Sequence, residues 1–222
     1  MTQPPADTKT ATLDAVLAER AAVHPHALAF AHDAERITYR ELHEQAGALA
    51  AGLVRMGIRP GDRVALFVPA GLDFARCFWA VQLAGAVSVA FNPYTPAVTA
   101  VRRASRVRPS LTLLWRIDDE FAREASSLGL RCIALEDVPR AGNALRIEVD
   151  PEAFAFFQPT SGTTGESRAV MIRHRNVMAV LRAYRQAYYV DTKDVMVSWV
   201  PPWHDLGLVR FMIGVARPCA AA

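Results

Sequence analysis

Residues 160–165 form an uninterrupted run of threonine, serine and glycine. Glycine lets a backbone turn tightly and come close to a ligand, and successive backbone amides in such a turn make a concave site for anions. The hydroxyl groups of Ser161, Thr163 and Thr164 add hydrogen-bond donors. Arg168 follows three residues later, and its guanidinium matches the geometry of phosphate oxygens. These residue types could bind a phosphate group, and the alternative is an ordinary polar loop.

The residues before this run favour the phosphate-binding interpretation. A short apolar segment at residues 153–157 is typical of a buried strand, and it leads directly into the run. The spacing differs from the two common nucleotide-binding patterns, because neither G-x-x-x-x-G-K-[ST] nor a strand followed by G-x-G-x-x-G occurs. A G-x-S-x-G motif is also absent, which disfavours a serine hydrolase.

Two motifs resemble those of the adenylate-forming enzymes, which include acyl-CoA synthetases, fatty-acyl-AMP ligases, luciferases and peptide-synthetase adenylation domains. The family's loop reads TSGTTGxPKG, followed by a segment like V-x-x-x-H-x-N. Residues 160–176 read TSGTTGESRAVMIRHRN, with His174 and Asn176 at the matching places. Residues 197–208, VSWVPPWHDLGL, are similar to the PPYHDMGL segment of fatty-acyl-AMP ligases and related long-chain ligases. The resemblance extends over roughly residues 12–214.

Family members activate a carboxylic acid with ATP, which gives an acyl adenylate and pyrophosphate. The resemblance implies that the β- and γ-phosphates are held by Thr160, Ser161, Gly162, Thr163, Thr164 and Gly165. Thr164 would also help to hold Mg²⁺. Arg168 would supply cationic support as a catalytic residue, in place of the family's lysine. Ser167 and Ala169 replace the proline and glycine that flank this lysine in the family.

The second motif implies a place for the acid. By the resemblance, Trp203 and His204 lie near the acyl carboxylate or the wall of its tunnel, which makes His204 the second catalytic candidate. Asp205 either orients the imidazole or caps a following helix. His174 is expected to close the phosphate loop structurally. The resemblance further implies a fatty or other carboxylic acid as substrate and coenzyme A, or the phosphopantetheine arm of an acyl carrier protein, as acceptor.

Later parts of the family pattern cannot be placed in this sequence. They are an adenine-binding segment with a magnesium-binding glutamate, an aspartate that holds the ribose, and a C-terminal lid with a catalytic lysine. We therefore expect a disordered leader at residues 1–11 and an incomplete, inactive N-terminal adenylation domain at residues 12–222, without the lid. The alternative is a non-catalytic remnant that keeps only the phosphate-binding loop. An incomplete sheet would expose strand edges and apolar faces, which predicts self-association.

Composition narrows the class of protein. Of the 222 residues, 52% are hydrophobic and 21% are charged, which argues against disorder. No uncharged apolar run reaches about 18 residues, and no secretory signal is recognised, so we expect neither a membrane span nor secretion. Cys77, Cys132 and Cys219 form no CxxC pair, which predicts neither a zinc site nor a disulfide framework and fits the cytoplasm.

The densest basic run does not favour a nucleic-acid partner. It consists of Arg102, Arg103, Arg106 and Arg108. Nucleic-acid grooves usually place stacking aromatic side chains among such charges, and none lies inside this run. The run is more typical of a solvated helix face than of a polyanion site.

The pattern of apolar residues predicts an α/β fold in which alternating strands and helices form parallel sheets. Expected helices begin at Thr12 and end before Pro25, follow a capping box at Thr38 and Glu41, and occupy residues 72–86, 96–109 and 176–189. Expected strands occupy residues 27–31, 63–68, 87–91, 111–115, 131–135, 153–157 and 195–200. Residues 137–152 are rich in proline, glycine and charge, which suggests a connection between two sub-modules.

Overall fold

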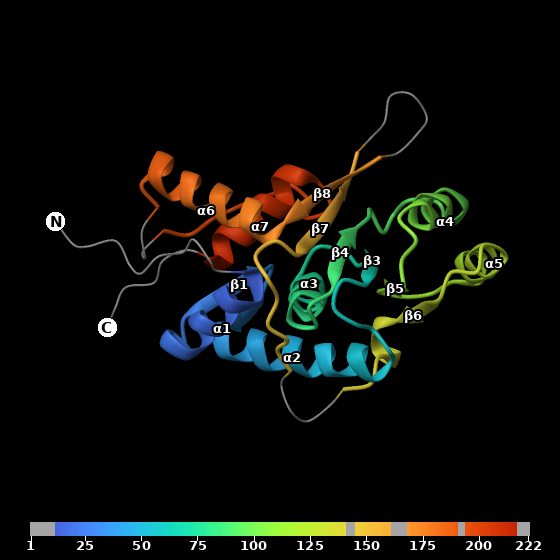
Figure 1. The fold of residues 1–222 in the computed structure, drawn as a ribbon, viewed down its shortest axis with the longest axis horizontal. Coiled ribbons are helices and arrows are strands. Elements are labelled where there is room, and N and C mark those ends of the chain that lie inside the picture. Colours follow the sequence, from blue (N-terminus) through green and yellow to red (C-terminus); the bar gives the residue numbers. More distant parts are fainter. Residues whose placement is uncertain (1–11, 141–144, 161–167, 191–193, 217–222) are drawn as a thin grey trace.

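The structure is a computed structural model that describes residues 12–140, 145–160, 168–190 and 194–216. Its main feature is a six-stranded sheet in the order β6-β5-β3-β4-β7-β8 (Figure 1). The strands are β3 (Arg63–Phe67), β4 (Val87–Ala90), β5 (Leu111–Leu114), β6 (Cys132–Ala134), β7 (Phe154–Pro159) and β8 (Ala169–Arg173). All neighbouring pairs are parallel except β7 and β8, which form an antiparallel hairpin at one edge.

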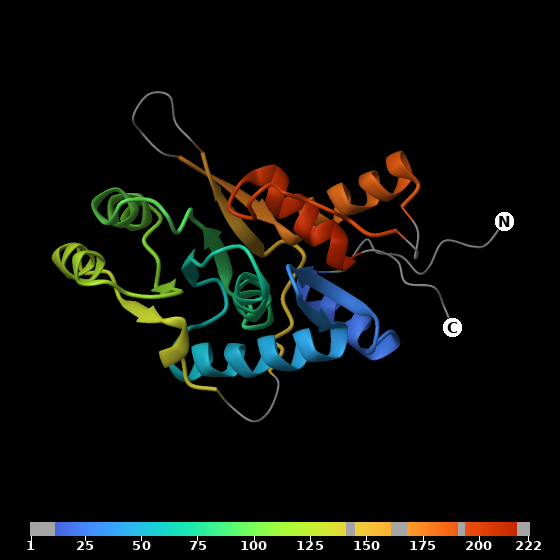
Figure 2. The same cartoon turned by 180° about the vertical axis from the view of Figure 1, so that it is seen from behind.

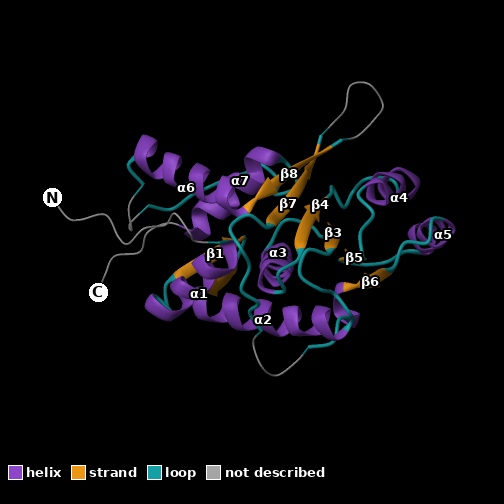
Figure 3. Cartoon of the chain, in the orientation of Figure 1, coloured by secondary structure: helices purple, strands orange, loops and turns teal. Residues whose placement is uncertain are grey.

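Helices cover both faces of this sheet, as Figures 1 and 3 show. They are α1 (Leu13–Val23), α2 (Tyr39–Arg55), α3 (Leu72–Leu83), α4 (Ala97–Arg106), α5 (Asp119–Ser127), α6 (His174–Tyr188) and α7 (Asp205–Ala216). A short hairpin of β1 (Leu28–His32) and β2 (Glu35–Thr38) lies beside α1, and a 3-10 turn, η2 (Leu135–Asp137), follows β6. The α/β class and the mostly parallel pairing predicted from the sequence are confirmed.

Successive residues of β3 point to two separate cores. Val64 and Leu66 belong to a large core with α2 and α3, whereas Ala65 and Phe67 belong to a smaller core with α4 and α5. Ten of the twelve residues of α3 are buried, so this helix lies in the middle of the large core. This alternation is the period of two that a strand buried on both faces requires.

α4 presents a contrasting pattern. Its alanines and Val101 are buried against the sheet, whereas Arg102, Arg103 and Arg106 are exposed. A helix of this kind buries one stripe and leaves the opposite face to water. The arginine run is therefore a solvated helix face, as its sequence predicted.

Most of the predicted elements are present at their expected places. The capping box of α2 is confirmed, since Thr38 Oγ1 accepts from the amide of Glu41 over 3.3 Å and the Glu41 carboxylate accepts from the amide of Thr38 over 2.8 Å. The predicted leader at residues 1–11 lies outside the described residues. Cys77 and Cys132 are free thiols, and burial raises the pKa of both. No helix among the described residues is long and apolar enough to span a membrane.

The strand predicted at residues 195–200 is wrong. Residues 194–200 form no strand in the described structure, because no described strand pairs with them. Val195, Val197 and Trp199 are exposed instead. The expectation of parallel pairing also fails at β8, which runs antiparallel to β7.

Residues 145–153 carry the chain from the η2 region back to β7, and no helix or strand occurs in this described stretch. Their backbone is held along the helices, since Leu145 donates to the carbonyl of Gly47 over 3.2 Å and Ile147 donates to that of Leu83 over 2.8 Å. In Figure 2 this connection rises from α2 past α3 to the beginning of β7. That position delivers β7 to its place beside β4.

Candidate functional site

The β7–β8 hairpin carries the first motif. Its two strands pair from Phe154 and Arg173 at the base to Pro159 and Ala169 at the other end. There the amide of Thr160 donates to the carbonyl of Arg168 over 2.8 Å, and the Thr160 hydroxyl donates to the same oxygen over 3.1 Å. We call this Thr160–Arg168 pair the mouth of the hairpin. It lies beyond the carboxyl end of β7, the side of a parallel sheet where ligands usually bind.

The residues between the two sides of the mouth are not described. Residues 161–167 lie outside the described part of the chain. The expected contacts of Ser161, Gly162, Thr163, Thr164 and Gly165 with phosphate, and that of Thr164 with Mg²⁺, therefore stay predictions.

Arg168 is exposed at the mouth. Within the described residues, its guanidinium forms neither an ion pair nor a hydrogen bond, and only its backbone carbonyl is engaged. No carboxylate of the described residues engages its donors, and a guanidinium of this kind can bind an anionic ligand.

The second motif reaches the same end of β7. The side-chain amide of Gln158 donates to the backbone carbonyl of Trp203 over 3.1 Å. The ring of Tyr94, which follows β4, packs edge-on against the ring of Trp203 with centroids 6.0 Å apart. Because Gln158 stands two residues before Thr160, the Trp203–His204 turn lies close to the mouth of the hairpin.

The turn that carries His204 is tight. The amide of His204 donates to the carbonyl of Pro201 over 3.0 Å, and the amide of Leu208 donates to the carbonyl of His204 over 2.8 Å. Gly207 makes this possible, because a Cβ atom at its position would lie 2.1 Å from the Pro201 carbonyl oxygen. The glycine in PPWHDLG thus lets the first turn of α7 approach the Pro201 backbone.

His204 and Asp205 do not act on each other in this structure. The Asp205 carboxylate accepts from the amide of Leu206 over 2.7 Å, at the beginning of α7. The imidazole of His204 is exposed and makes no hydrogen bond to another described residue. Of the two roles considered for Asp205, the geometry favours the one at the helix start.

His174 lies at the opposite end of β8 from the mouth. Its ring is buried, and Nδ1 accepts from the amide of Leu13 over 3.2 Å, at the start of α1. Burial lowers the pKa of His174 to about 4, against the opposing effect of Asp14. The expectation that His174 closes the phosphate loop is therefore wrong. It joins α6 to α1 instead.

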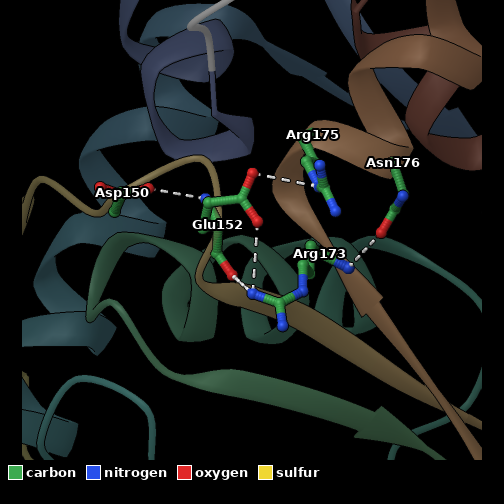
Figure 4. A network of polar contacts seen from close by, with 5 residues as sticks. All are labelled: Asp150, Glu152, Arg173, Arg175 and Asn176. Carbon is green, nitrogen blue, oxygen red and sulfur yellow. Dashed lines mark hydrogen bonds and ion pairs between the residues drawn. The ribbon is translucent and has the colours of Figure 1, made fainter.

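The base of the hairpin holds a polar cluster that sequence reasoning missed (Figure 4). Glu152 precedes β7, and its carboxylate contacts both Arg173 and Arg175. The amide of Arg173 donates to Asn176 Oδ1 over 3.1 Å. The sequence shows Glu152 just before one apolar strand and Arg173 and Arg175 at the end of the next. Only the pairing of β7 with β8 shows that these opposite charges lie in contact.

A cavity of about 400 Å³ lies between β1, α7 and residues 195–202. Its lining includes Phe74 and Phe211 but neither Arg168 nor His204. It is therefore separate from the hairpin mouth, and we do not assign the candidate site to it.

Comparison with known proteins decides the family. The sequence profile described as AMP-binding enzyme matches residues 17–219. The chain belongs to the AMP-binding enzyme family. This membership confirms the resemblance to adenylate-forming enzymes on which the two motifs were first interpreted.

The relatives of this AMP-binding chain are longer than the chain itself. It is 29% identical over 205 residues to indigoidine synthase of Streptomyces lavendulae. This alignment covers 88% of the chain and 16% of the synthase. It is 28% identical over 215 residues to 4-coumarate–CoA ligase 4 of Arabidopsis thaliana. This alignment covers 83% of the chain and 37% of the ligase.

The fold is also that of the family. The crystal structure of fatty acyl-adenylate ligase from L. pneumophila, in complex with acyl adenylate and pyrophosphate, matches with a TM-score of 0.79 and 28% identity. The match covers 94% of this chain and 39% of that structure. The AMP-binding chain thus spans well under two thirds of the length of each of these proteins, and it has the fold of the N-terminal part of adenylate-forming ligases.

Proposed function

We propose that the chain contributes to ATP-dependent activation of a carboxylic acid to an acyl adenylate. In this reaction a carboxylate oxygen attacks the α-phosphorus of ATP, the bond to the bridging oxygen of the β-phosphate breaks, and pyrophosphate leaves. The observation that carries the proposal is the meeting of two motifs at one end of β7: the Thr160–Arg168 mouth and the Trp203–His204 turn, which Gln158 joins.

The residues at the mouth suit a polyphosphate. Arg168 offers an exposed guanidinium with no carboxylate partner among the described residues, and Thr160 holds the two sides of the mouth together. Arg168 would bind the charge that grows on the phosphate oxygens during attack and departure, which is the main electrostatic demand of this chemistry. The run at residues 160–165 would orient the β- and γ-phosphates so that pyrophosphate leaves in line.

Mg²⁺ would reach the site together with ATP. Among the described residues, no three histidine, cysteine, aspartate or glutamate side chains gather into a metal site. Mg²⁺ is commonly bound by substrate phosphates and one or two protein oxygens, so a hydroxyl such as that of Thr164 fits its preference. The ion would neutralise phosphate charge, and the protein side chains would keep the phosphates in position.

The turn beyond β7 suits an acid with an apolar body. Trp203 and Tyr94 pack edge to face and form an aromatic wall beside the mouth. His204 is exposed there and could donate a hydrogen bond to the carboxylate of the acid, so that its oxygen faces the α-phosphorus. We therefore propose a fatty acid or another apolar acid as substrate, with coenzyme A or a carrier-protein phosphopantetheine thiol as acceptor.

Binding and turnover can be tested separately on the purified chain. Titration calorimetry should detect binding of Mg²⁺-ATP, which Arg168→Ala should weaken about tenfold, as expected for loss of a charged hydrogen-bond donor. Arg168→Lys, which restores the family's residue, should retain most of the affinity. Arg102→Ala on the exposed face of α4 is the matched control and should bind as the wild type does.

ATP–pyrophosphate exchange with a panel of fatty and aromatic acids then tests activation. Acid-dependent exchange supports the proposal. Binding of Mg²⁺-ATP without exchange in the presence of any acid favours the non-catalytic alternative. No heat from Mg²⁺-ATP with folded wild-type chain would overturn the phosphate-binding role itself.

A further inference from the structure

We propose that Glu152 is a positioning residue that holds β8 in register with β7 and thereby sets Arg168 opposite Thr160. The inference rests on the proposed phosphate-binding role of the mouth, and it assigns that role a second set of residues at the far end of the hairpin. We call Glu152, Arg173 and Arg175 the hairpin clamp.

The carboxylate of Glu152, just before β7, contacts Arg173 at the end of β8 and Arg175 at the start of α6 (Figure 4). Glu152 Oε1 lies 3.1 Å from Arg175 Nε, and Glu152 Oε2 lies 3.4 Å from Arg173 Nη1. The same Arg173 nitrogen donates to the backbone carbonyl of Glu152 over 2.6 Å. Glu152 is itself oriented, because its amide donates to Asp150 Oδ1 over 2.7 Å.

Register is weakly specified in β8 by burial. Among the described strands β8 lies at the edge of the sheet and pairs with β7 alone, and Val170 and Met171 are 50% and 57% exposed. A strand without a well-buried face can slip by one residue at little cost, and such a slip turns every side chain to the opposite face. Ile172 is half-buried and packs against the large core, so burial contributes to the register of β8 through a partly buried contact near its base.

A bulge near the base also disturbs the pairing of β7 with β8. The pairing of β7 with β8 is irregular between Phe154 and Phe156, next to the base. A bulge puts an extra residue on one strand, leaves that residue unpaired and disrupts the ladder locally. Arg173 lies opposite Phe154 in this register, and its guanidinium stands 4.8 Å above the Phe154 ring while it binds Glu152. The clamp thus fixes the pairing on the base side of the bulge.

The register at the base determines the geometry at the mouth. Four residues of β8 lie between Arg173 of the clamp and Arg168, and a strand is stiff over this length. The bonds from Thr160 to the Arg168 carbonyl form only in the register that the clamp holds. Loss of the clamp would therefore spread Arg168 over several positions relative to Thr160.

The clamp should contribute little to overall stability. The side chains of Glu152, Arg173 and Arg175 are 54%, 38% and 57% exposed, and exposed ion pairs stabilise folded proteins weakly. A positioning role therefore predicts that loosening of β8 and weaker phosphate binding occur without a matching loss of stability, whereas a merely structural role predicts that all three change together.

The test compares Glu152→Ala and Glu152→Gln with Glu148→Gln, which removes another exposed carboxylate that is ion-paired with Arg146. Hydrogen exchange of the β8 amides needs no nucleotide. Glu152→Ala should speed this exchange and weaken Mg²⁺-ATP binding by roughly fivefold each, the size of one exposed ion-pair network. AMP, which lacks the β- and γ-phosphates, and the melting temperature should report no comparable change.

Glu152→Gln keeps the shape and one acceptor, so it should recover part of the wild-type behaviour, and Glu148→Gln should match the wild type. Equal β8 exchange in wild type and Glu152→Ala overturns the inference, as does a loss of stability that accounts for the whole effect. Faster β8 exchange in Glu152→Ala, combined with a wild type that does not bind Mg²⁺-ATP, supports the positioning role of Glu152 and overturns the proposed function of the mouth. If Glu152→Ala does not fold, Arg173→Ala provides the same comparison, because it removes the nitrogen that contacts both the carboxylate and the backbone carbonyl of Glu152.

Discussion

Gln158 and Trp203 are 45 residues apart in the chain, and the side-chain amide of Gln158 donates to the Trp203 carbonyl over 3.1 Å. This bond attaches the turn before α7 to the last part of β7. It brings the residues of the second motif to the mouth of the hairpin, where the first motif ends. The candidate site therefore depends on a contact between two segments whose order in the chain gives no sign of it.

Gln158→Glu should break this attachment. A carboxylate cannot donate to the Trp203 carbonyl, and Gln158 Oε1 is already buried without a hydrogen-bond partner among the described residues. We expect the free energy of unfolding in urea to fall by about 1–3 kcal/mol, the usual cost of leaving buried polar groups unpaired. Gln45→Glu is the matched control, because Gln45 accepts from Arg76 Nε and a carboxylate would strengthen that bond. Equal destabilisation by both changes would count against the Gln158–Trp203 contact.

Gly207→Ala should strain the start of α7. The added Cβ would lie 2.1 Å from the Pro201 carbonyl oxygen, so the turn that carries His204 would have to move. We expect a loss of about 1–3 kcal/mol, as for other overpacked sites. Gly214→Ala in the same helix should be tolerated or stabilising, since its nearest neighbour, Met196 Cβ, lies at 3.5 Å and alanine favours a helix more than glycine does. Urea denaturation of both variants measures the difference, and a neutral Gly207→Ala would contradict the close approach.

The buried His174 should make stability depend on pH. Burial lowers its pKa from 6.5 to about 4, so the unfolded chain takes up this proton at a higher pH than the folded chain does. The neutral ring contributes fully above about pH 6.5, and its contribution is lost as the pH falls towards about 4. The loss is on the order of 3 kcal/mol.

His174→Asn tests this assignment, because an asparagine oxygen can accept from the Leu13 amide without titrating. Unfolding in urea at several pH values between 4 and 7.5 should show a flatter dependence for His174→Asn than for the wild type. A residual slope should remain, since burial also lowers the pKa of His43. His26→Asn, at an exposed position, should keep the wild-type slope. Identical slopes in all three proteins would rule out His174 as the source.

The exposed strip of Val195, Val197 and Trp199 should cause self-association. These side chains are 69%, 76% and 85% exposed, and they lie along the rim of the adjacent cavity, whose lining they share with Met196, Ser198 and Val200. Exposed apolar strips of this kind favour contacts between molecules. Sedimentation velocity over a range of concentrations should show association of the wild type, and Trp199→Ser should reduce it. Trp115→Ser, at a separate exposed tryptophan that stacks with Arg116, is the control and should leave association unchanged. A wild type that stays monomeric at every concentration would refute this prediction.

The wrong prediction of a strand at residues 195–200 shows what a local sequence pattern cannot establish. An alternating apolar pattern indicates a strand only if another strand pairs with it, and no described strand does so here. The sequence does not predict β8 or α5, for a related reason. Only Phe121 and Ala125 are buried in α5, and β8 keeps exposed apolar residues at the sheet edge, so neither element has a clear periodic signal.

The sequence by itself determined the α/β class, most of the helices and strands, the capping of α2 by Thr38 and Glu41, and the motifs that indicate the family. These features depend on local spacing, since capping, turn formation and burial periodicity act between residues that are close in the chain. The tertiary structure alone decided that β8 runs back along β7, that His174 binds the start of α1, that Glu152 contacts Arg175 and that Gln158 binds Trp203. Each of these depends on contacts between distant segments, whose energies are set by packing and pairing geometry that no local pattern records.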